Sequence, residues 1–313
     1  MTPRLLGNSG IAIAPLVFGG NVFGWTADEA RSFALLDRFV ERGFNAIDTA
    51  DSYSAWVPGN QGGESETVIG NWLRQRGRRD DVMLMTKVGM WERRKGLSAA
   101  NIEAAVEDSL RRLGTDYIDV YFAHIDDAET PLEETLTAFS RLVDAGKVRA
   151  LGASNYIAER LQEALKLSAD KGLPRYEVLQ PEYNLYDRHG FESGLGEVAR
   201  SNGLGAICYF ALASGFLSGK YRSVEDLEGR PRAAILKKYF DERGLRILAT
   251  LRELSQELSA TPAQISLAWL LARTRFTAPI VSATDLDQLD DVLAAAELNL
   301  TGEVMRRLDE ASV

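Results

Sequence analysis

Eight short apolar runs, each followed by a longer amphipathic segment, alternate along this chain of 313 residues. The runs are rich in β-branched residues, and such alternation is typical of strand–helix units that build a parallel sheet. Eight units in one uninterrupted chain of this length predict a (β/α)8 TIM barrel, as a single domain over 1–313. The runs are Leu16–Gly19, Phe44–Asp48, Val82–Val88, Tyr117–His124, Val148–Ser154, Tyr176–Tyr183, Gly205–Leu212 and Thr277–Ala283.

The amphipathic segments carry signals for helix starts and stops. Three pairs have the spacing of a capping box: Thr26 with Glu29, Thr130 with Glu133, and Thr261 with Gln264. Two prolines stand where the first helical residue is expected: Pro131 and Pro262. Four glycines occupy the expected left-handed stops: Gly43, Gly114, Gly146 and Gly172.

A doubly wound open sheet is the alternative fold. It is disfavoured because Gly19-Gly20, after the first run, does not match the Gly-x-Gly-x-x-Gly pattern of dinucleotide-binding sheets. Residues 5–13 contain a Gly-bearing turn between apolar residues, which predicts a short N-terminal β-hairpin at the bottom of the barrel.

Composition excludes several function classes. The formal net charge is −9 with no block of Lys and Arg, which argues against nucleic-acid binding. No apolar run approaches the roughly 20 residues of a membrane helix, and the first ten residues lack the apolar core of a signal peptide. The single cysteine, Cys208, excludes a disulfide framework and a cysteine-rich zinc site. We therefore expect a cytoplasmic protein with no metal centre.

Ionisable residues gather where the apolar runs end. Asp48 closes the second run, Lys87 lies near the end of the third, His124 closes the fourth, and Tyr53 follows Asp48 by five residues. In a (β/α)8 barrel these ends converge on the face that carries active sites. A lysine inside an apolar run also needs a partner for its charge. The four residues are therefore candidates for one site.

Together the four residues make chemical sense as a proton-transfer unit. A tyrosine phenol titrates near about 10, and a neighbouring ammonium lowers its pKa by favouring the phenolate. Asp48 would hold Lys87 charged beside Tyr53, and a neutral His124 would orient a substrate oxygen. The sequence thus predicts general acid/base catalysis by Tyr53.

An ordered set of motifs resembles the aldo-keto reductases over essentially the whole chain. The motifs are Asp48-Thr-Ala-Asp-Ser-Tyr53, Thr86-Lys87, Asp119-Val-Tyr-Phe-Ala-His124 and Gly152-Ala-Ser154-Asn155. The resemblance implies reversible hydride transfer between a nicotinamide and a carbonyl or alcohol, with Tyr53 as the proton donor. It also implies that Ser154, Asn155 and Gln180 bind the carboxamide and that Tyr209 stacks on the nicotinamide ring.

The resemblance further implies two loops that grip the dinucleotide. Lys220 supplies positive charge in the first loop, and Arg232 matches a family arginine that reaches the adenosine 2′-phosphate. NADP(H) is therefore the favoured cofactor. The other residues expected beside the cofactor on this basis are Gly20, Asn21, Leu212, Ser214, Gly215, Leu217 and Ser282.

The second loop departs from the family pattern. Asp285 stands where the family has a basic residue, and an inward-pointing carboxylate would repel a phosphate. Thr284 remains a candidate phosphate ligand, and Gln288 and Asp291 remain candidates for contacts with the adenine. NAD(H) is consequently the alternative cofactor.

Three tryptophans in loops after strands, Trp25, Trp56 and Trp91, are candidates for the walls of the substrate pocket. They favour a hydrophobic, aromatic or sugar-like small-molecule carbonyl or alcohol substrate. Two further functions stay open: an NAD(H)-linked sugar or alcohol dehydrogenase, and a cofactor-sensing regulatory protein similar to potassium-channel β-subunits. A homo-oligomer is compatible with either.

Overall fold

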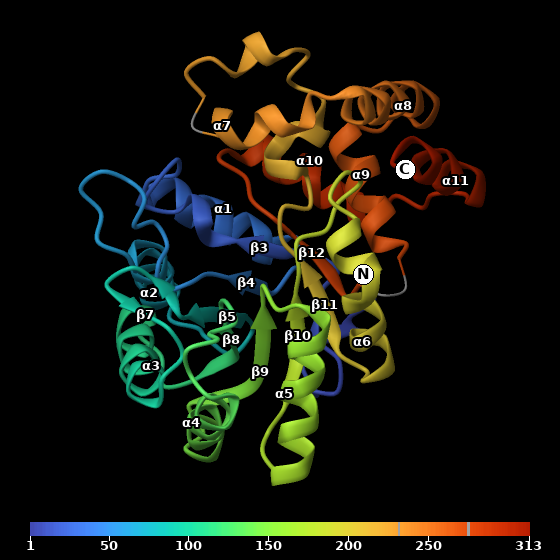
Figure 1. The fold of residues 1–313 in the computed structure, drawn as a ribbon. Helices are drawn as coiled ribbons and strands as arrows, with labels where there is room; N and C mark the ends of the chain where they lie inside the picture. The colour runs from blue at the N-terminus through green and yellow to red at the C-terminus, as the bar shows by residue number, and fades with distance from the viewer. Residues whose placement is uncertain (231, 274–275) are drawn as a thin grey trace.

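Eight parallel strands close into a barrel in the computed structural model, which describes residues 1–230, 232–273 and 276–313 (Figure 1). Each predicted run contains one strand, so the (β/α)8 prediction is confirmed. The ring closes where β9 pairs with β10, with Ser154 opposite Gln180. Around the ring the strands are β10 (Tyr176–Gln180), β11 (Gly205–Cys208), β12 (Ala278–Val281), β3 (Val17–Gly19), β4 (Ala46–Asp48), β5 (Met83–Val88), β8 (Ile118–Ala123) and β9 (Val148–Ser154).

Helices surround the barrel, and two of them, α7 and α8, lie in the connection between β11 and α9 (Figure 1). None of the helices within the described residues is both long and apolar enough to cross a bilayer. The helices are α1 (Glu29–Glu41), α2 (Glu64–Arg76), α3 (Ala99–Leu113), α4 (Leu132–Asp144), α5 (Ala158–Lys171), α6 (Gly196–Ser201), α7 (Ala233–Leu236), α8 (Glu242–Leu258), α9 (Pro262–Leu271), α10 (Leu286–Ala294) and α11 (Gly302–Ala311).

The barrel interior is packed with apolar side chains. An N-terminal hairpin of β1 (Arg4–Leu5) and β2 (Ala12–Ile13) adds Leu6, Ile11 and Ile13 to the same cluster, so the predicted hairpin below the barrel is confirmed. Gly7, at φ 57°, approaches the start of β11 so closely that a Cβ atom would lie 2.5 Å from the nitrogen of Gly205. The interior residues from the strands include Val17, Ala46, Met85, Val120, Phe122, Ala150, Val178, Ile207 and Ala278.

The helix-end predictions hold in part. The capping box of Thr261 and Gln264 is present, with Pro262 as the first residue of α9. All four predicted stop glycines have positive φ, at or one residue beyond the C-cap.

Two predicted helix starts are wrong. The start at Thr26 fails because Asp28 is the N-cap of α1 and accepts from the nitrogen of Arg31 at 2.9 Å. At α4, Thr130 donates instead to Asp127 at 2.7 Å, and Pro131 is the N-cap rather than the first helical residue.

Candidate active site

The four predicted catalytic residues meet at the carboxyl ends of three neighbouring strands. Asp48 is the last residue of β4, Lys87 is the last but one of β5, and His124 directly follows β8. Tyr53 lies in the turns after β4. Because the strands are parallel, their carboxyl ends share one face of the barrel, where TIM-barrel active sites are found.

Lys87 is the centre of this group. Its Nζ is fully buried and donates to Asp48 Oδ2 at 2.6 Å, to the carbonyl oxygen of Thr49 at 2.7 Å and to Tyr53 Oη at 3.3 Å. Burial lowers the pKa of Lys87, but the attraction of Asp48 and Tyr53 outweighs burial, so the pKa is raised. Lys87 is therefore a permanent cation beside the tyrosine hydroxyl.

The Tyr53 phenol keeps its proton at neutral pH. Burial raises its pKa, and the opposing effect of Lys87 does not overcome burial. The sequence argument considered only the lysine, which lowers the pKa of a neighbouring phenol. The lowering by Lys87 is present, yet burial of the phenol and the negative charge of Asp48 outweigh it, so the net shift of the Tyr53 pKa is upward.

His124 is neutral in this site. Its ring lies edge-on to Tyr53, with centroids 5.9 Å apart. Burial and then the nearby charge of Lys87 lower the pKa of His124 well below its ordinary value. Among the described residues, no hydrogen-bond partner reaches Nδ1. A neutral imidazole can hydrogen-bond an oxygen without adding charge.

The predicted carboxamide residues are linked to the same group. Gln180 Nε2 donates to the second oxygen of Asp48 at 2.9 Å, and Ser154 Oγ donates to the carbonyl oxygen of Gln180 at 2.9 Å. Tyr209 Oη donates to Asn155 Oδ1 at 2.8 Å, while Asn155 Nδ2 donates to the carbonyl oxygen of His124 at 2.8 Å. The structure thus brings together Ser154, Asn155, Gln180 and Tyr209 beside the four candidate catalytic residues.

The loop after β11 forms a tight turn with Ser214 at φ 58° and Gly215 at φ 101°. Ser214 Oγ is buried and has no hydrogen-bond partner among the described residues. Lys220 is exposed, and its ammonium lies 5.1 Å from the ring centroid of Tyr221. Leu212 is half-buried, whereas Leu217 is fully buried.

Arg232 is held without a carboxylate. Its Nη2 donates to the side-chain oxygen of Asn21 at 3.1 Å, with the Asn21 amide oriented so that it also donates to Ser282 Oγ at 2.7 Å. Its guanidinium carbon lies 5.3 Å from the ring centroid of Trp25. Burial lowers the pKa of Arg232, and no described carboxylate forms an ion pair with it. Gly20 directly precedes Asn21. A side chain at this position would collide with Ser65, because a Cβ atom there would lie 2.8 Å from Ser65 Oγ.

The polar side chains in and just after the loop that follows β12 form hydrogen bonds within the protein. Asp285 is the N-cap of α10 and accepts from the nitrogen of Gln288 at 2.9 Å. Gln288 Oε1 accepts from the nitrogen and the hydroxyl of Thr284 at 3.2 and 3.1 Å. Asp291 accepts from Thr261 Oγ1 at 3.0 Å and from the side-chain amide of α9 residue Gln264 at 2.8 Å. These side chains therefore hold the loop and α10 in place.

Two of the three predicted pocket tryptophans lie beside Tyr53. The ring of Trp56 is edge-on to Tyr53 at 5.6 Å and to Trp25 at 5.7 Å, and 48% of Trp56 is exposed. Trp91 has a different position: its indole nitrogen donates to the carbonyl oxygen of Gln61 at 2.9 Å. Trp91 thus anchors the loop that carries Trp56.

Three contributors to the site are absent from the sequence argument. One is the Thr49 carbonyl that binds Lys87, and the others are the buried acids Asp51 and Glu66 just outside the barrel. The position of Asp51 between Asp48 and Tyr53 is a signal that points to it. A backbone carbonyl gives no such signal.

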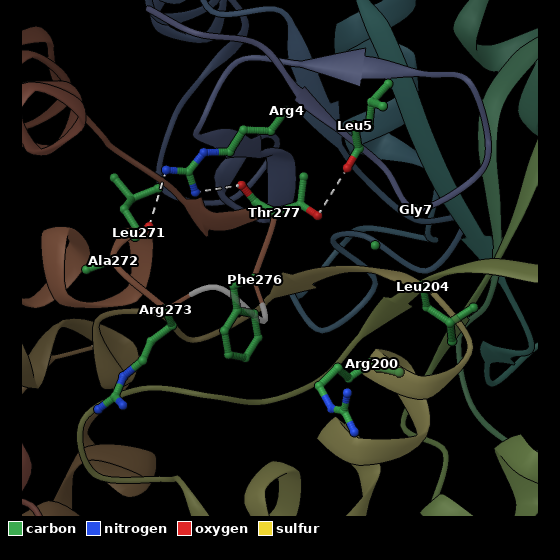
Figure 2. A pocket seen from close by; sticks show the side chains of 13 residues that line it. Arg4, Leu5, Gly7, Arg200, Leu204, Leu271, Ala272, Arg273, Phe276 and Thr277 are labelled. Carbon is green, nitrogen blue, oxygen red and sulfur yellow. Dashed lines mark hydrogen bonds between the residues drawn. The ribbon is translucent and has the colours of Figure 1, made fainter.

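A cavity of about 590 Å³ lies at the other end of the barrel, between the N-terminal hairpin and the starts of β11 and β12 (Figure 2). There Arg4 donates to the carbonyl oxygens of Leu271 and Thr277, both at 3.2 Å. None of the predicted site residues is among its described lining. No cluster of described His, Cys, Asp and Glu side chains is arranged to hold a metal ion.

Comparison with known proteins adds relatives over nearly the full length. Residues 15–313 match the aldo/keto reductase family. The chain is 34% identical to the uncharacterized oxidoreductase YrpG of Bacillus subtilis, covering 97% of this chain and 94% of that protein. It is 32% identical to L-glyceraldehyde 3-phosphate reductase of Escherichia coli O157:H7 (99% and 92%). It is also 32% identical to a probable voltage-gated potassium channel subunit beta of Oryza sativa subsp. japonica (99% and 96%).

Proposed function

The chain belongs to the aldo/keto reductase family, an NAD(P)H-dependent class of oxidoreductases, and from that premise we propose that it reduces aldehydes and ketones with NADP(H). In this proposal Tyr53 is the catalytic acid. The observation that carries it is the contact of Lys87 Nζ with both Asp48, at 2.6 Å, and Tyr53 Oη, at 3.3 Å.

The residues around the mouth fit a dinucleotide. The buried hydroxyl of Ser214, which has no hydrogen-bond partner within the described part of the chain, and the adjacent left-handed backbone suit a pyrophosphate, because such turns direct N–H groups at an anion. The amide and hydroxyl groups of Ser154, Asn155 and Gln180 suit a carboxamide. When bound, the nicotinamide supplies the hydride that adds to the carbonyl carbon of the substrate.

Residues of this chain donate the proton and stabilise the charge that remains. Tyr53 holds a proton at neutral pH and donates it to the carbonyl oxygen as that oxygen becomes an alkoxide. The phenolate that remains lies beside the Lys87 ammonium, which stabilises its charge. Asp48 keeps Lys87 in position, and neutral His124 hydrogen-bonds the substrate oxygen.

Tyr53→Phe tests the proposal. The variant keeps the ring contacts but has no proton to give, so kcat for a reactive aromatic aldehyde should fall about 10²–10⁴-fold, with unchanged cofactor affinity. Tyr117→Phe is the matched control, because Tyr117 lies under Arg79, ring centroid to guanidinium carbon 4.2 Å, away from the site. Near-normal kcat in Tyr53→Phe would remove Tyr53 from the mechanism.

Arg232 supports the choice of NADP(H). A guanidinium that stacks on Trp25 and has no described carboxylate partner is available for a phosphate dianion. A 2′-phosphate distinguishes NADP(H) from NAD(H) and is the group that needs such a cation.

One observation favours NAD(H) as the second candidate. Asp285 already occupies the N-terminus of α10, so a carboxylate stands where a helix would otherwise attract a phosphate. Fluorescence titration with NADPH and NADH decides between the two cofactors. Affinity at least about tenfold higher for NADPH is the expected result, equivalent to about 1.4 kcal/mol.

The substrate class follows from the wall of Trp25 and Trp56. An apolar aromatic wall beside the proton donor favours an aromatic or hydrophobic carbonyl compound. The similarity to L-glyceraldehyde 3-phosphate reductase adds short sugar aldehydes to the substrates that we propose. A panel of both kinds of aldehyde, run with both cofactors, identifies the better class.

A further inference from the structure

A polar layer is buried behind the active site, between the strands β4, β5 and β8 and the helices α2 and α3. Asp51 is its least satisfied member: it is 1% exposed, and neither carboxyl oxygen has a hydrogen-bond partner among the described residues. Its backbone nitrogen donates to the carbonyl oxygen of Lys87 at 3.2 Å. Asp51 thus lies in the segment between Asp48 and Tyr53, and its side chain belongs to the polar layer outside the barrel.

A charged pair faces Asp51 from the helices. Glu66 of α2 is fully buried; it accepts from Thr86 Oγ1 at 2.6 Å and from Arg112 Nε of α3 at 2.6 Å. Glu66 and Arg112 therefore form a buried ion pair. Since Asp51 lies near Glu66, a second negative charge in the layer is disfavoured.

The remaining ionisable groups around Asp51 do not neutralise it. Arg94, in β7 (Arg94–Lys95), forms an ion pair with Asp108 at 2.8 Å. The hydroxyl of Tyr121 in β8 is buried without a hydrogen-bond partner among the described residues. Burial and then Glu66 raise the pKa of Asp51 to about 8, against the opposing effects of Arg112, the Ser52 amide and Arg94.

We propose that Asp51 is a positioning residue for the proton transfer at Tyr53, a buried carboxyl that is uncharged during carbonyl reduction and, once ionised, makes Tyr53 retain its proton more strongly. This inference rests on the proposed role of Tyr53. It follows from proximity: the two residues share one turn, and a negative charge on Asp51 raises the pKa of the Tyr53 phenol. Asp51 is buried outside the barrel and would act only through Tyr53.

The consequence appears in the oxidative direction. Alcohol oxidation needs Tyr53 as a base, so its rate should rise with pH as the phenol deprotonates. In the wild-type protein Asp51 ionises over the same range and opposes that deprotonation. The rise is therefore flattened above about pH 8, and the normalised kcat/KM at pH 10 should be about threefold to tenfold lower than it would be without the charge of Asp51, which raises the pKa of Tyr53.

The experiment measures kcat/KM for alcohol oxidation from pH 6 to 10 in wild type and variants, each normalised to its own value at pH 6.5. Asp51→Asn should remove the flattening of the pH profile near pH 8, which we call the step. Glu66→Gln should move the step to lower pH, because a neighbouring negative charge is lost, and Arg112→Gln should move it to higher pH. Asp116→Asn, at an exposed site, is the matched control.

The outcomes separate this inference from the proposed function. A step that is absent in the wild type, or that persists in Asp51→Asn, overturns the role of Asp51. Opposite shifts in Glu66→Gln and Arg112→Gln support it even if Asp51→Asn does not fold, since a merely structural role would not move the step in two directions. Tyr53→Phe is run in parallel, and near-normal activity in that variant would instead reject the proposed function.

Discussion

The two sides of the barrel mouth differ in how far they are organised. On the side of β4, β5 and β8, the candidate catalytic side chains contact one another directly, as Lys87 does with Asp48 and Tyr53. On the side of β11 and β12, Thr284, Asp285 and Gln288 bind one another, while Arg232 has no described carboxylate partner. Side chains at strand ends are placed by the sheet itself, whereas loop side chains satisfy each other until a ligand competes.

The strongest test of this comparison is Lys87→Met. Removing the cation leaves Asp48 buried without its ion-pair partner, which should cost about 3–5 kcal/mol in the free energy of unfolding. Activity should fall about 10²–10⁴-fold, because the Tyr53 phenolate loses its stabilising charge. Urea unfolding and kcat measure the two effects.

A double variant and a control sharpen that result. Lys87→Met with Asp48→Asn should recover part of the stability and none of the activity, because the unpaired buried charge is gone while the catalytic cation is still missing. Lys95→Met removes a lysine whose side chain is 63% exposed and should change neither quantity. If Lys87→Met alone kept wild-type stability, the catalytic side would not depend on this ion pair.

The contrast between strand-end and loop side chains also explains what could be predicted from the sequence. Asp48, Lys87 and His124 end apolar runs, and the run pattern fixes both the strands and the face on which these side chains meet. Tyr53 followed from a motif of six residues. The grouping of these four candidate residues was therefore accessible from local spacing combined with the barrel topology.

Longer-range contacts were not accessible in that way. Gln180 binds Asp48 across 132 positions of the chain, and Arg232 binds Asn21 across a still longer stretch of sequence. Asp285 was expected to repel a phosphate, but its use as the N-cap of α10 depends on the backbone angle of the loop. Likewise, the net pKa of Tyr53 depends on burial, which no spacing of residues specifies.

Arg232→Ala should produce the largest effect on the loop side. Loss of a charge-assisted contact of about 1.5–3 kcal/mol predicts about a 10- to 150-fold weaker affinity for NADPH and no change for NADH. Fluorescence titration measures both affinities. Arg230→Ala, an exposed arginine two residues earlier, is the matched control. Equal weakening of both cofactors would mean that Arg232 supports the loop through Trp25 rather than binding the 2′-phosphate.

Trp56→Ala should have a smaller effect that depends on the substrate. The loss of one aromatic contact, about 0.5–1.5 kcal/mol, should raise KM for an aromatic aldehyde about twofold to tenfold and leave a short aliphatic aldehyde unaffected. Trp91→Phe is the informative comparison, because it removes the hydrogen bond to Gln61 that anchors the loop. A change in the loop would alter KM for both aldehydes alike. We expect this result for Trp91→Phe but not for Trp56→Ala.

The smallest expected effect is at Asp285, where cap and charge can be separated. Asp285→Asn keeps a side-chain oxygen for the nitrogen of Gln288 and removes the negative charge, so NADPH should bind about two- to threefold more tightly, within the range of helix-terminus charge effects. Asp285→Ala also removes the cap and should lower stability by about 0.5–2 kcal/mol. Asp287→Asn removes an exposed charge from the first turn without touching the cap. If Asp287→Asn improved NADPH affinity as much as Asp285→Asn did, the effect would be general electrostatics, and Asp285 would have no specific part in the choice of cofactor.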